Sequence, residues 1–236
     1  MKPDSLACRA QPFLDYLEEW TASLPVLSWD DILVDPSKTA VLSVDVINGF
    51  CYEGPLSSPR VARIVEPITR LFESAWACGV RHILLAEDTH EPEAVEFAQW
   101  PPHCVRGTSE AETVSAFKAL PFFPHMLRLE KNSIHAGLDT DLNKWINCHP
   151  EVDTFIVTGD CTDLCTYQLA MHLRVDANAR QIRRRVIVPA DCVDTYDLPV
   201  ETAREQGILP HPGDLLHAVF LYHMQLNGVE VAARIE

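Results

Sequence analysis

Residues 155–165 read Phe155-Ile-Val-Thr-Gly-Asp-Cys-Thr-Asp-Leu-Cys165. The apolar run Phe155–Val157 predicts a buried strand, and Gly159 ends it. Thr162 and Asp163 are residue types favoured at helix N-caps, and a helical pattern follows them. Cys165 is therefore expected in the first turn of a helix, directly after the carboxyl end of a strand.

Cys165 has two interpretations at such a position. The helix dipole and the free backbone N–H groups favour a thiolate, and the N–H groups of Cys161 and Cys165 are placed to hold a developing oxyanion. Alternatively, Cys165 is a small buried hydrophobe, which is the usual environment of a free cysteine. This stretch alone leaves the two interpretations balanced.

The composition narrows the class of protein. The chain has 236 residues, 47% of them hydrophobic, and 19 basic against 34 acidic side chains give a net charge of −15. Such an acidic surface repels nucleic acid and anionic lipid, so we expect neither a nucleic-acid nor a membrane partner. The basic run Arg183–Arg185 is interpreted as a solvated turn. Eight cysteines without zinc-ribbon spacing, and no apolar leader, favour reduced thiols in a cytoplasmic protein.

Strands and helices alternate along most of the chain, which predicts a three-layer α/β/α, Rossmann-like fold with a mainly parallel central sheet. Residues 1–38 are interpreted as an N-terminal extension and residues 39–236 as one domain. The expected strands are 40–45, 80–86, 126–129, 154–158, 186–190 and 229–232, and the expected helices are 12–20, 59–78, 109–119, 139–147, 163–178, 199–206 and 213–226.

Three reactive side chains follow or end predicted strands: Asp45, Lys131 and Cys165. Because parallel sheets place their sites at the carboxyl ends of strands, the three are expected to meet. Singly, Asp45 is as compatible with a loop cap and Lys131 with an ordinary surface lysine. Together they supply a nucleophile, a general base and a cation for hydrolysis through a thioester.

A second cluster of polar residues lies between Asp45 and Lys131. Asp88 and His90 follow a predicted strand, and Glu96 and His103 come from the irregular stretch after it. Two imidazoles with one or two carboxylates suit zinc, iron or manganese. The alternative is a polar loop in which both histidines only cap turns. Cys104 is expected to pack away from this group.

The chain resembles the isochorismatase-like cysteine hydrolases, and among them the nicotinamidases, over about residues 39–195. Four blocks carry the resemblance: Val44-Asp-Val-Ile-Asn-Gly-Phe-Cys51, Asp88-Thr-His90 with Trp100-Pro-Pro-His-Cys-Val-Arg-Gly-Thr108, Glu130-Lys-Asn132, and Thr158-Gly-Asp-Cys-Thr-Asp-Leu-Cys165. The Trp-Pro-Pro-His string is the most specific of them.

The resemblance implies the triad Asp45, Lys131 and Cys165, an oxyanion hole at Cys161 and Cys165, and a cis peptide bond before Cys161. It implies one divalent metal ion, with zinc expected and iron or manganese as alternatives. The implied metal ligands are Asp88, His90, Glu96 and His103. Phe50 and Trp100 would enclose the substrate ring. The chain departs from the family pattern at Ile47, Gly49, Cys161 and Leu164.

Three hypotheses for the function follow. The leading one is hydrolysis of nicotinamide to nicotinate and ammonia, a step in NAD salvage, by a homo-oligomeric enzyme. A second is the same chemistry on another small amide, ureide or isochorismate-type substrate. The third is a non-catalytic metal-binding or interaction protein that keeps the fold.

Overall fold

A six-stranded, wholly parallel sheet forms the centre of the computed structural model, which describes residues 5–236. The strand order is β4-β3-β2-β5-β6-β7, so the chain moves outward from β2 in one direction and then returns to its other side with β5. The crevice between β2 and β5 is the point at which such sheets bind ligands. The six strands are β2 (Thr39–Val44), β3 (His82–Asp88), β4 (Leu127–Lys131), β5 (Thr154–Gly159), β6 (Arg185–Pro189) and β7 (Glu230–Ala232).

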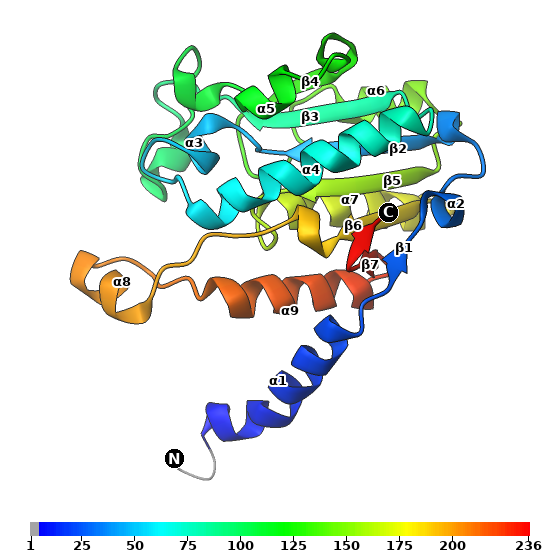
Figure 1. The fold of residues 1–236 in the computed structure, drawn as a ribbon. Helices are drawn as coiled ribbons and strands as arrows, with labels where there is room; N and C mark the ends of the chain where they lie inside the picture. The colour runs from blue at the N-terminus through cyan, green and yellow to red at the C-terminus, as the bar shows by residue number, and fades with distance from the viewer. Residues whose placement is uncertain (1–4) are drawn as a thin grey trace.

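Helices cover both faces of this sheet, which confirms the predicted three-layer fold (Figure 1). Alternate side chains of β2 point to opposite faces: Val41 packs with the apolar side of α4, whereas Leu42 packs with α6, α7 and α9. The helices are α1 (Leu6–Ala22), α2 (Trp29–Ile32), α3 (Asn48–Cys51), α4 (Pro59–Ala77), α5 (Ser115–Lys118), α6 (Leu142–Cys148), α7 (Cys165–Ala179), α8 (Val200–Gln206) and α9 (Gly213–Leu226).

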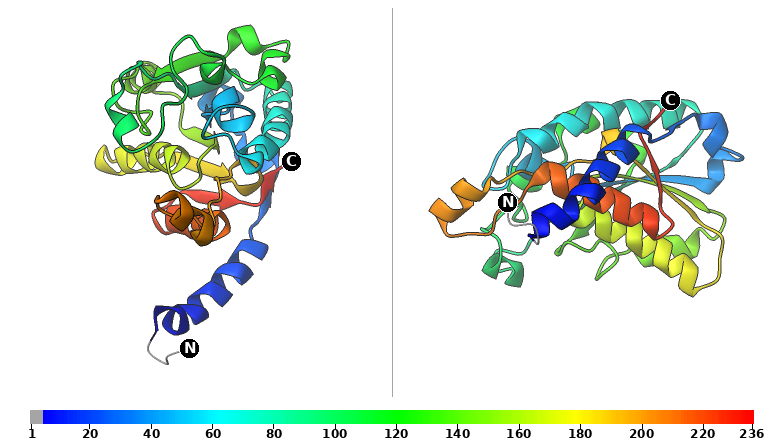
Figure 2. Two further views of the ribbon diagram at one scale, coloured as in Figure 1. Left: turned by 90° about the vertical axis from the view of Figure 1, so that its left-hand side faces the viewer. Right: turned by 90° about the horizontal axis from the view of Figure 1, so that it is seen from below.

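The N-terminal extension is joined to the C-terminal end of the chain. Strand β1 (Val26–Leu27) pairs in parallel with β8 (Arg234–Ile235) to form a separate two-stranded sheet. Helix α1 extends away from the central sheet beside α9, as the two rotated views in Figure 2 also show, and its Phe13, Tyr16 and Trp20 rings contact Tyr222. None of the helices within residues 5–236 combines the length and apolar character needed to cross a membrane.

The predicted helix 109–119 is wrong as a continuous element. The segment instead contains a 3-10 turn at Ser109–Ala111 and the short helix α5. Between them Thr113 bridges Ile47, and the Val114 N–H donates to the carbonyl of Val46. A backbone that pairs with a neighbouring segment cannot also make helical hydrogen bonds, so tertiary pairing overrides the local pattern.

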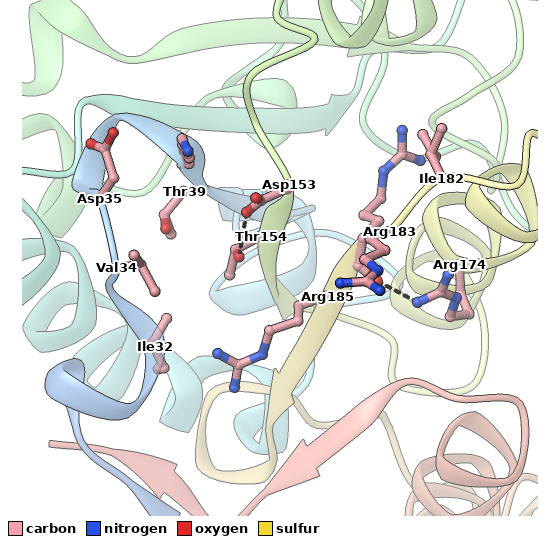
Figure 3. A pocket seen from close by; sticks show the side chains of 12 residues that line it. Ile32, Val34, Asp35, Thr39, Asp153, Thr154, Arg174, Ile182, Arg183 and Arg185 are labelled. Atoms are coloured by element: carbon pink, nitrogen blue, oxygen red, sulfur yellow. Dashed lines mark hydrogen bonds between the residues drawn. The ribbon is translucent and has the colours of Figure 1, made fainter.

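The basic run Arg183–Arg185, predicted to be a solvated turn, is only partly exposed to solvent. Arg183 is exposed, but Arg184 is buried, donates to Asp176 at 2.8 Å and lies over the Phe155 ring, while Arg185 pairs with Glu230. These arginines line a cavity of about 540 Å³ at the amino-terminal edge of the sheet, opposite the carboxyl ends of its strands (Figure 3). Because Arg184 and Arg185 are already paired with carboxylates, much of the local charge is neutralised within the protein.

Gly159 is required where β5 approaches β2. Its φ is +112°, and a Cβ at this position would lie 2.0 Å from the carbonyl oxygen of Val44. Gly207 also has a positive φ, +70°, but a Cβ there would meet no atom within 4 Å. A substitution at Gly207 therefore measures the cost of the backbone conformation alone, whereas one at Gly159 adds the cost of a steric clash.

We expect Gly207→Ala to lower the free energy of unfolding by about 1 kcal/mol, the usual cost of a left-handed conformation. Gly159→Ala should cost at least about 2 kcal/mol more, because β2 and β5 must also separate. Urea denaturation followed by circular dichroism measures both values. Equal losses for the two variants would contradict the predicted clash.

Candidate active site

The three predicted catalytic side chains meet at the carboxyl edge of the sheet. Asp45 directly follows β2, Lys131 is the last residue of β4, and Cys165 is the first residue of α7 after β5. The register pairs Asp88 of β3 with Lys131, so these two side chains lie on the same face of neighbouring strands. All four residues are buried, with at most 6% of their surface exposed.

Lys131 lies at the centre of this group. Its Nζ is 2.8 Å from Oδ2 of Asp45, 2.5 Å from Oδ1 of Asp88 and 3.8 Å from Sγ of Cys165. It also donates to the carbonyl oxygen of Ser133 at 3.2 Å. Asp45 is fixed further, because its Oδ1 accepts the Asp88 backbone N–H at 2.8 Å. The ammonium group therefore holds the candidate base and the candidate nucleophile in one arrangement.

The electrostatics favour a neutral thiol in the resting site. Burial raises the pKa of the Cys165 thiol well above its usual value, although Lys131 acts in the opposite direction. The sequence interpretation likewise requires Asp45 to take the thiol proton, because the helix N-terminus favours the thiolate but burial opposes it. Burial and the charge of Asp88 raise the pKa of Asp45 to about 7, despite the opposing effect of Lys131. A carboxylate with that pKa is a better proton acceptor than an ordinary aspartate.

The turn before α7 contains a cis peptide bond between Asp160 and Cys161, as the resemblance implies. The backbone N–H groups of Cys161 and Cys165 have no hydrogen-bond acceptor within residues 5–236. They are available to an oxyanion, as the sequence predicts.

The predicted N-cap role of Thr162 and Asp163 is wrong. Leu164 occupies the N-cap position of α7 and makes no capping hydrogen bond through its side chain. The Thr162 and Asp163 side chains instead bind His217 and His211 of the C-terminal segment.

Asp88, His90 and His103 form a compact group of metal-ligand type, with one potential ligand atom from each lying within 4.8 Å of the others. Nδ1 of His90 hydrogen-bonds to Oδ1 of Asn132 at 2.9 Å, and Nδ1 of His103 to the carbonyl oxygen of Pro101 at 2.8 Å. Both acceptors select the tautomer whose Nε2 carries a lone pair, as in histidines that bind metals.

His90 and His103 have further properties of metal ligands. Nε2 of His90 is buried and makes no hydrogen bond within the described part of the chain. Burial lowers the pKa of His103, which favours the neutral imidazole that a metal requires. Burial acts in the same direction on His90, but Asp88, whose Oδ1 lies 3.6 Å from Nε2, outweighs it and raises the pKa of His90. The donor set, with Nε2 of His90 beside the Asp88 carboxylate and without a hydrogen bond within residues 5–236, fits a divalent cation.

Glu96, the fourth predicted ligand, lies outside this group of three. It belongs to the 3-10 turn Val95–Ala98 and is half-buried, and burial together with the charge of Asp88 raises its pKa. Direct coordination by Glu96 therefore stays a prediction. Cys104 is fully buried in the apolar core and is absent from the group, which confirms the expectation for it.

Aromatic rings surround the two histidines. Phe50, an expected wall of the substrate slot, lies 5.6 Å from the ring of His103. Phe97 packs edge-on against both histidines at 5.4 and 5.6 Å and was missed by the sequence interpretation, although it directly follows Glu96. Trp100, the other expected wall, is half-buried and contacts Tyr196 edge-on at 6.3 Å.

The departure at Gly49 has a steric reason. A Cβ at this position would lie 2.6 Å from Sγ of Cys104 and 3.0 Å from Cβ of Glu110. Glu110 in turn accepts the backbone N–H of Cys104 at 3.0 Å. The segment that carries His103 therefore packs directly on Gly49, and a larger residue would displace it.

The comparisons with known proteins agree with this geometry. Residues 39–208 match the Isochorismatase domain. Nicotinamidase 1 of Arabidopsis thaliana is 28% identical over 222 residues, which cover 86% of this chain and 89% of that protein. Nicotinamidase/pyrazinamidase of Mycobacterium tuberculosis is 29% identical over 181 residues, 70% of this chain and 92% of that protein. A cysteine hydrolase from Pseudomonas syringae pv. phaseolicola has a similar structure, with a TM-score of 0.67, 22% identity, and coverage of 89% of this chain and 93% of that one.

The parallel α/β/α sheet carries a buried cysteine, lysine and aspartate at its carboxyl edge, an arrangement expected of a hydrolase. The chain belongs to the isochorismatase family, because the matched domain covers most of its length. The fold and the hydrolase class predicted from the sequence are thereby confirmed.

Replacing the central ammonium should destabilise the fold. Lys131→Met leaves the buried carboxylates of Asp45 and Asp88 without their cation, and we expect a loss of about 3–5 kcal/mol in the free energy of unfolding. Lys144→Met is the control, because Lys144 is exposed and pairs only with the exposed Asp141. Its effect should be within about 0.5 kcal/mol. Similar values for both variants in urea denaturation would contradict the assigned role of Lys131.

Proposed function

We propose that this protein is a metal-dependent nicotinamidase, which hydrolyses nicotinamide to nicotinate and ammonia through a thioester on Cys165. The observation that carries the proposal is the adjacency of two groups: Asp88 contacts Lys131 of the triad and also belongs to the candidate metal group with His90 and His103. A nucleophile therefore lies beside an anchor for a ring nitrogen. The names of the curated relatives support the same substrate.

In the acylation step, Asp45 accepts the thiol proton of Cys165 as Sγ attacks the amide carbonyl carbon. The N–H groups of Cys161 and Cys165 donate to the oxygen that becomes negative, and each such donor is worth about 10²–10³-fold in rate. Asp45 then returns the proton to the amide nitrogen, ammonia leaves, and the nicotinoyl thioester remains. General acid–base catalysis of this kind contributes about 10²–10⁴-fold.

In the deacylation step, Asp45 accepts a proton from water as the water oxygen attacks the thioester carbonyl. The same two N–H groups hold the second oxyanion. The carbon–sulfur bond then breaks, and the proton on Asp45 returns to Sγ of Cys165. The product leaves as nicotinic acid, which gives its remaining proton to water or to the released ammonia and becomes nicotinate. Lys131 keeps its positive charge throughout: burial acts to lower its pKa, but Asp45 and Asp88 outweigh burial and hold it well above the usual value.

The substrate ring would lie beside the candidate metal group. Asp88, His90 and His103 would hold a divalent ion, with Glu96 as a further ligand; zinc is expected from the donor types, and iron and manganese are alternatives. When bound, the ion supplies a Lewis acid that recognises the pyridine nitrogen. Phe50 and Trp100 would enclose the ring and exclude water, leaving the amide over Cys165.

The cellular setting follows from the same proposal. Nicotinate is a precursor for NAD salvage, and the eight cysteines, none of which forms a disulfide within residues 5–236, agree with the reduced thiols of a cytoplasmic enzyme. A homo-oligomer and the absence of nucleic-acid and membrane partners stay predictions from the sequence.

The test of the covalent mechanism compares two neighbouring cysteines. Cys165→Ala removes the nucleophile, so ammonia release from nicotinamide should fall by at least about 10⁴-fold. Cys161→Ala keeps the backbone N–H that the proposal uses and should retain activity within about tenfold. Mass spectrometry after a rapid acid quench should detect the nicotinoyl adduct only when Cys165 is present. Wild-type turnover by Cys165→Ala would exclude the thioester.

The test of the metal site needs no activity measurement. Purified protein should contain about one divalent ion per chain by elemental mass spectrometry, and His103→Ala should lose it. Asn132→Ala, which removes the acceptor that orients His90, should weaken metal binding by about 10–100-fold. His125→Ala is the control, because His125 is exposed and stacks on Trp76 away from the site. Full metal content in His103→Ala would contradict this assignment.

A further inference from the structure

The segment after β6 contacts the turn that carries Cys165. In this segment the Asp194 carbonyl accepts the Thr162 N–H at 3.0 Å, and Val193 bridges Gly159. The segment then runs out to α8 and returns at His211, where Leu198 and His211 exchange two backbone hydrogen bonds of 2.7 and 2.9 Å. Figure 1 shows α8 at the far end of this excursion. The return therefore fixes His211 against the active-site edge.

His211 makes a buried contact two residues from the nucleophile. Its Nε2 lies 2.8 Å from Oδ2 of Asp163, and its Nδ1 lies 2.9 Å from the carbonyl oxygen of Tyr196. Both His211 and Asp163 are only 8% exposed. The Asp163 carboxylate and the Tyr196 carbonyl therefore hold the imidazole ring at both of its nitrogens.

The contact with His211 stabilises the charged form of Asp163. Burial acts to raise the pKa of Asp163, but the hydrogen bond with His211 and the proximity of Thr195 outweigh it and hold the pKa below its usual value. A buried carboxylate needs such a partner, because removing one member of a buried pair leaves the other charge uncompensated. The pair therefore ties the turn 160–165 to the C-terminal segment.

A stack of rings connects the same histidine to the expected substrate wall. The Tyr196 ring stacks on His211 with centroids 3.7 Å apart and planes 17° apart, and Tyr196 contacts Trp100 edge-on. A second histidine, His217 of α9, hydrogen-bonds through Nδ1 to the Thr162 hydroxyl at 2.9 Å. The C-terminal segment thus contacts both the nucleophile turn and one wall of the slot.

We propose that His211 is a positioning residue for the reaction: its ion pair with Asp163 sets the place of Cys165 and of the two oxyanion donors relative to Asp45 and Lys131. This inference rests on the proposed function for the choice of nicotinamide as substrate, whereas the contacts of His211 do not depend on it. A nucleophile misplaced by about 1 Å can cost about 100-fold in rate. The sequence motif His211-Pro-Gly-Asp214 thereby gains a role outside the triad and the metal group.

The experiment compares three variants. His211→Phe keeps a ring on Tyr196 but removes both hydrogen bonds; His211→Gln keeps a donor for Asp163; and His223→Phe is a control on an exposed histidine of α9 that contacts Tyr167. For nicotinamide, His211→Phe should lower kcat by about 10–100-fold with KM changed by less than about threefold. The logarithm of the fold-loss in kcat should be at least a third smaller for His211→Gln than for His211→Phe. His223→Phe should have the kcat of the wild type.

A second readout is independent of the substrate. The rate at which iodoacetamide alkylates Cys165, followed by peptide mass spectrometry, reports its contact with Asp45 and Lys131 and should fall several-fold in His211→Phe. Failure of the wild type to release ammonia would refute the proposed function alone, because the alkylation comparison still tests His211.

Folding is checked by thermal denaturation. If His211→Phe does not fold, Asp163→Asn replaces it, since this near-isosteric change keeps an acceptor and removes the charge. A folded His211→Phe, or in its place a folded Asp163→Asn, with wild-type kcat and alkylation rate would overturn the inference. A loss confined to the melting temperature would overturn it as well.

Discussion

The buried ammonium of Lys131 is the interaction on which the site depends. Burying a carboxylate is costly unless a cation compensates it, and Asp45 and Asp88 are both buried within 2.8 Å of the same Nζ. Asp88 also belongs to the candidate metal group with His90 and His103. The proposed catalytic group and the candidate metal group are therefore electrostatically coupled, because a change in the charge on Asp88 affects Lys131 and Cys165.

The parallel sheet brings the residues of this arrangement to one edge. Strands β2, β3 and β4 are neighbours in register, so Asp45, Asp88 and Lys131 leave the same edge of the sheet. Cys165 comes from the other side of the switch point, after β5, which pairs with β2 along its whole length. Only a short turn then separates the strand from the nucleophile. Gly159 allows that turn to begin against the Val44 carbonyl.

The sequence predicted what depends on strand ends and missed what depends on tertiary contacts. The strand pattern placed Asp45, Lys131 and Cys165 at one edge because parallel strands all end there. It could not show that burial would raise the pKa of the Cys165 thiol despite the charge of Lys131, since desolvation depends on the surrounding core. It also could not show that Thr162 and Asp163 would bind histidines about 50 residues away instead of capping α7. The helix expected at 109–119 failed for the same reason, because residues 46–48 take its hydrogen bonds.

The absence of the predicted N-caps has a consequence for the turn before Cys165. A turn stabilised by its own N-caps would satisfy its helix N-terminus locally and leave fewer N–H groups for a substrate. Here the capping side chains are occupied by His211 and His217, and Leu164 at the N-cap makes no side-chain hydrogen bond. The N–H groups of Cys161 and Cys165 consequently remain without an acceptor within residues 5–236. Distant histidines thus stabilise the turn and preserve the donors that an oxyanion requires.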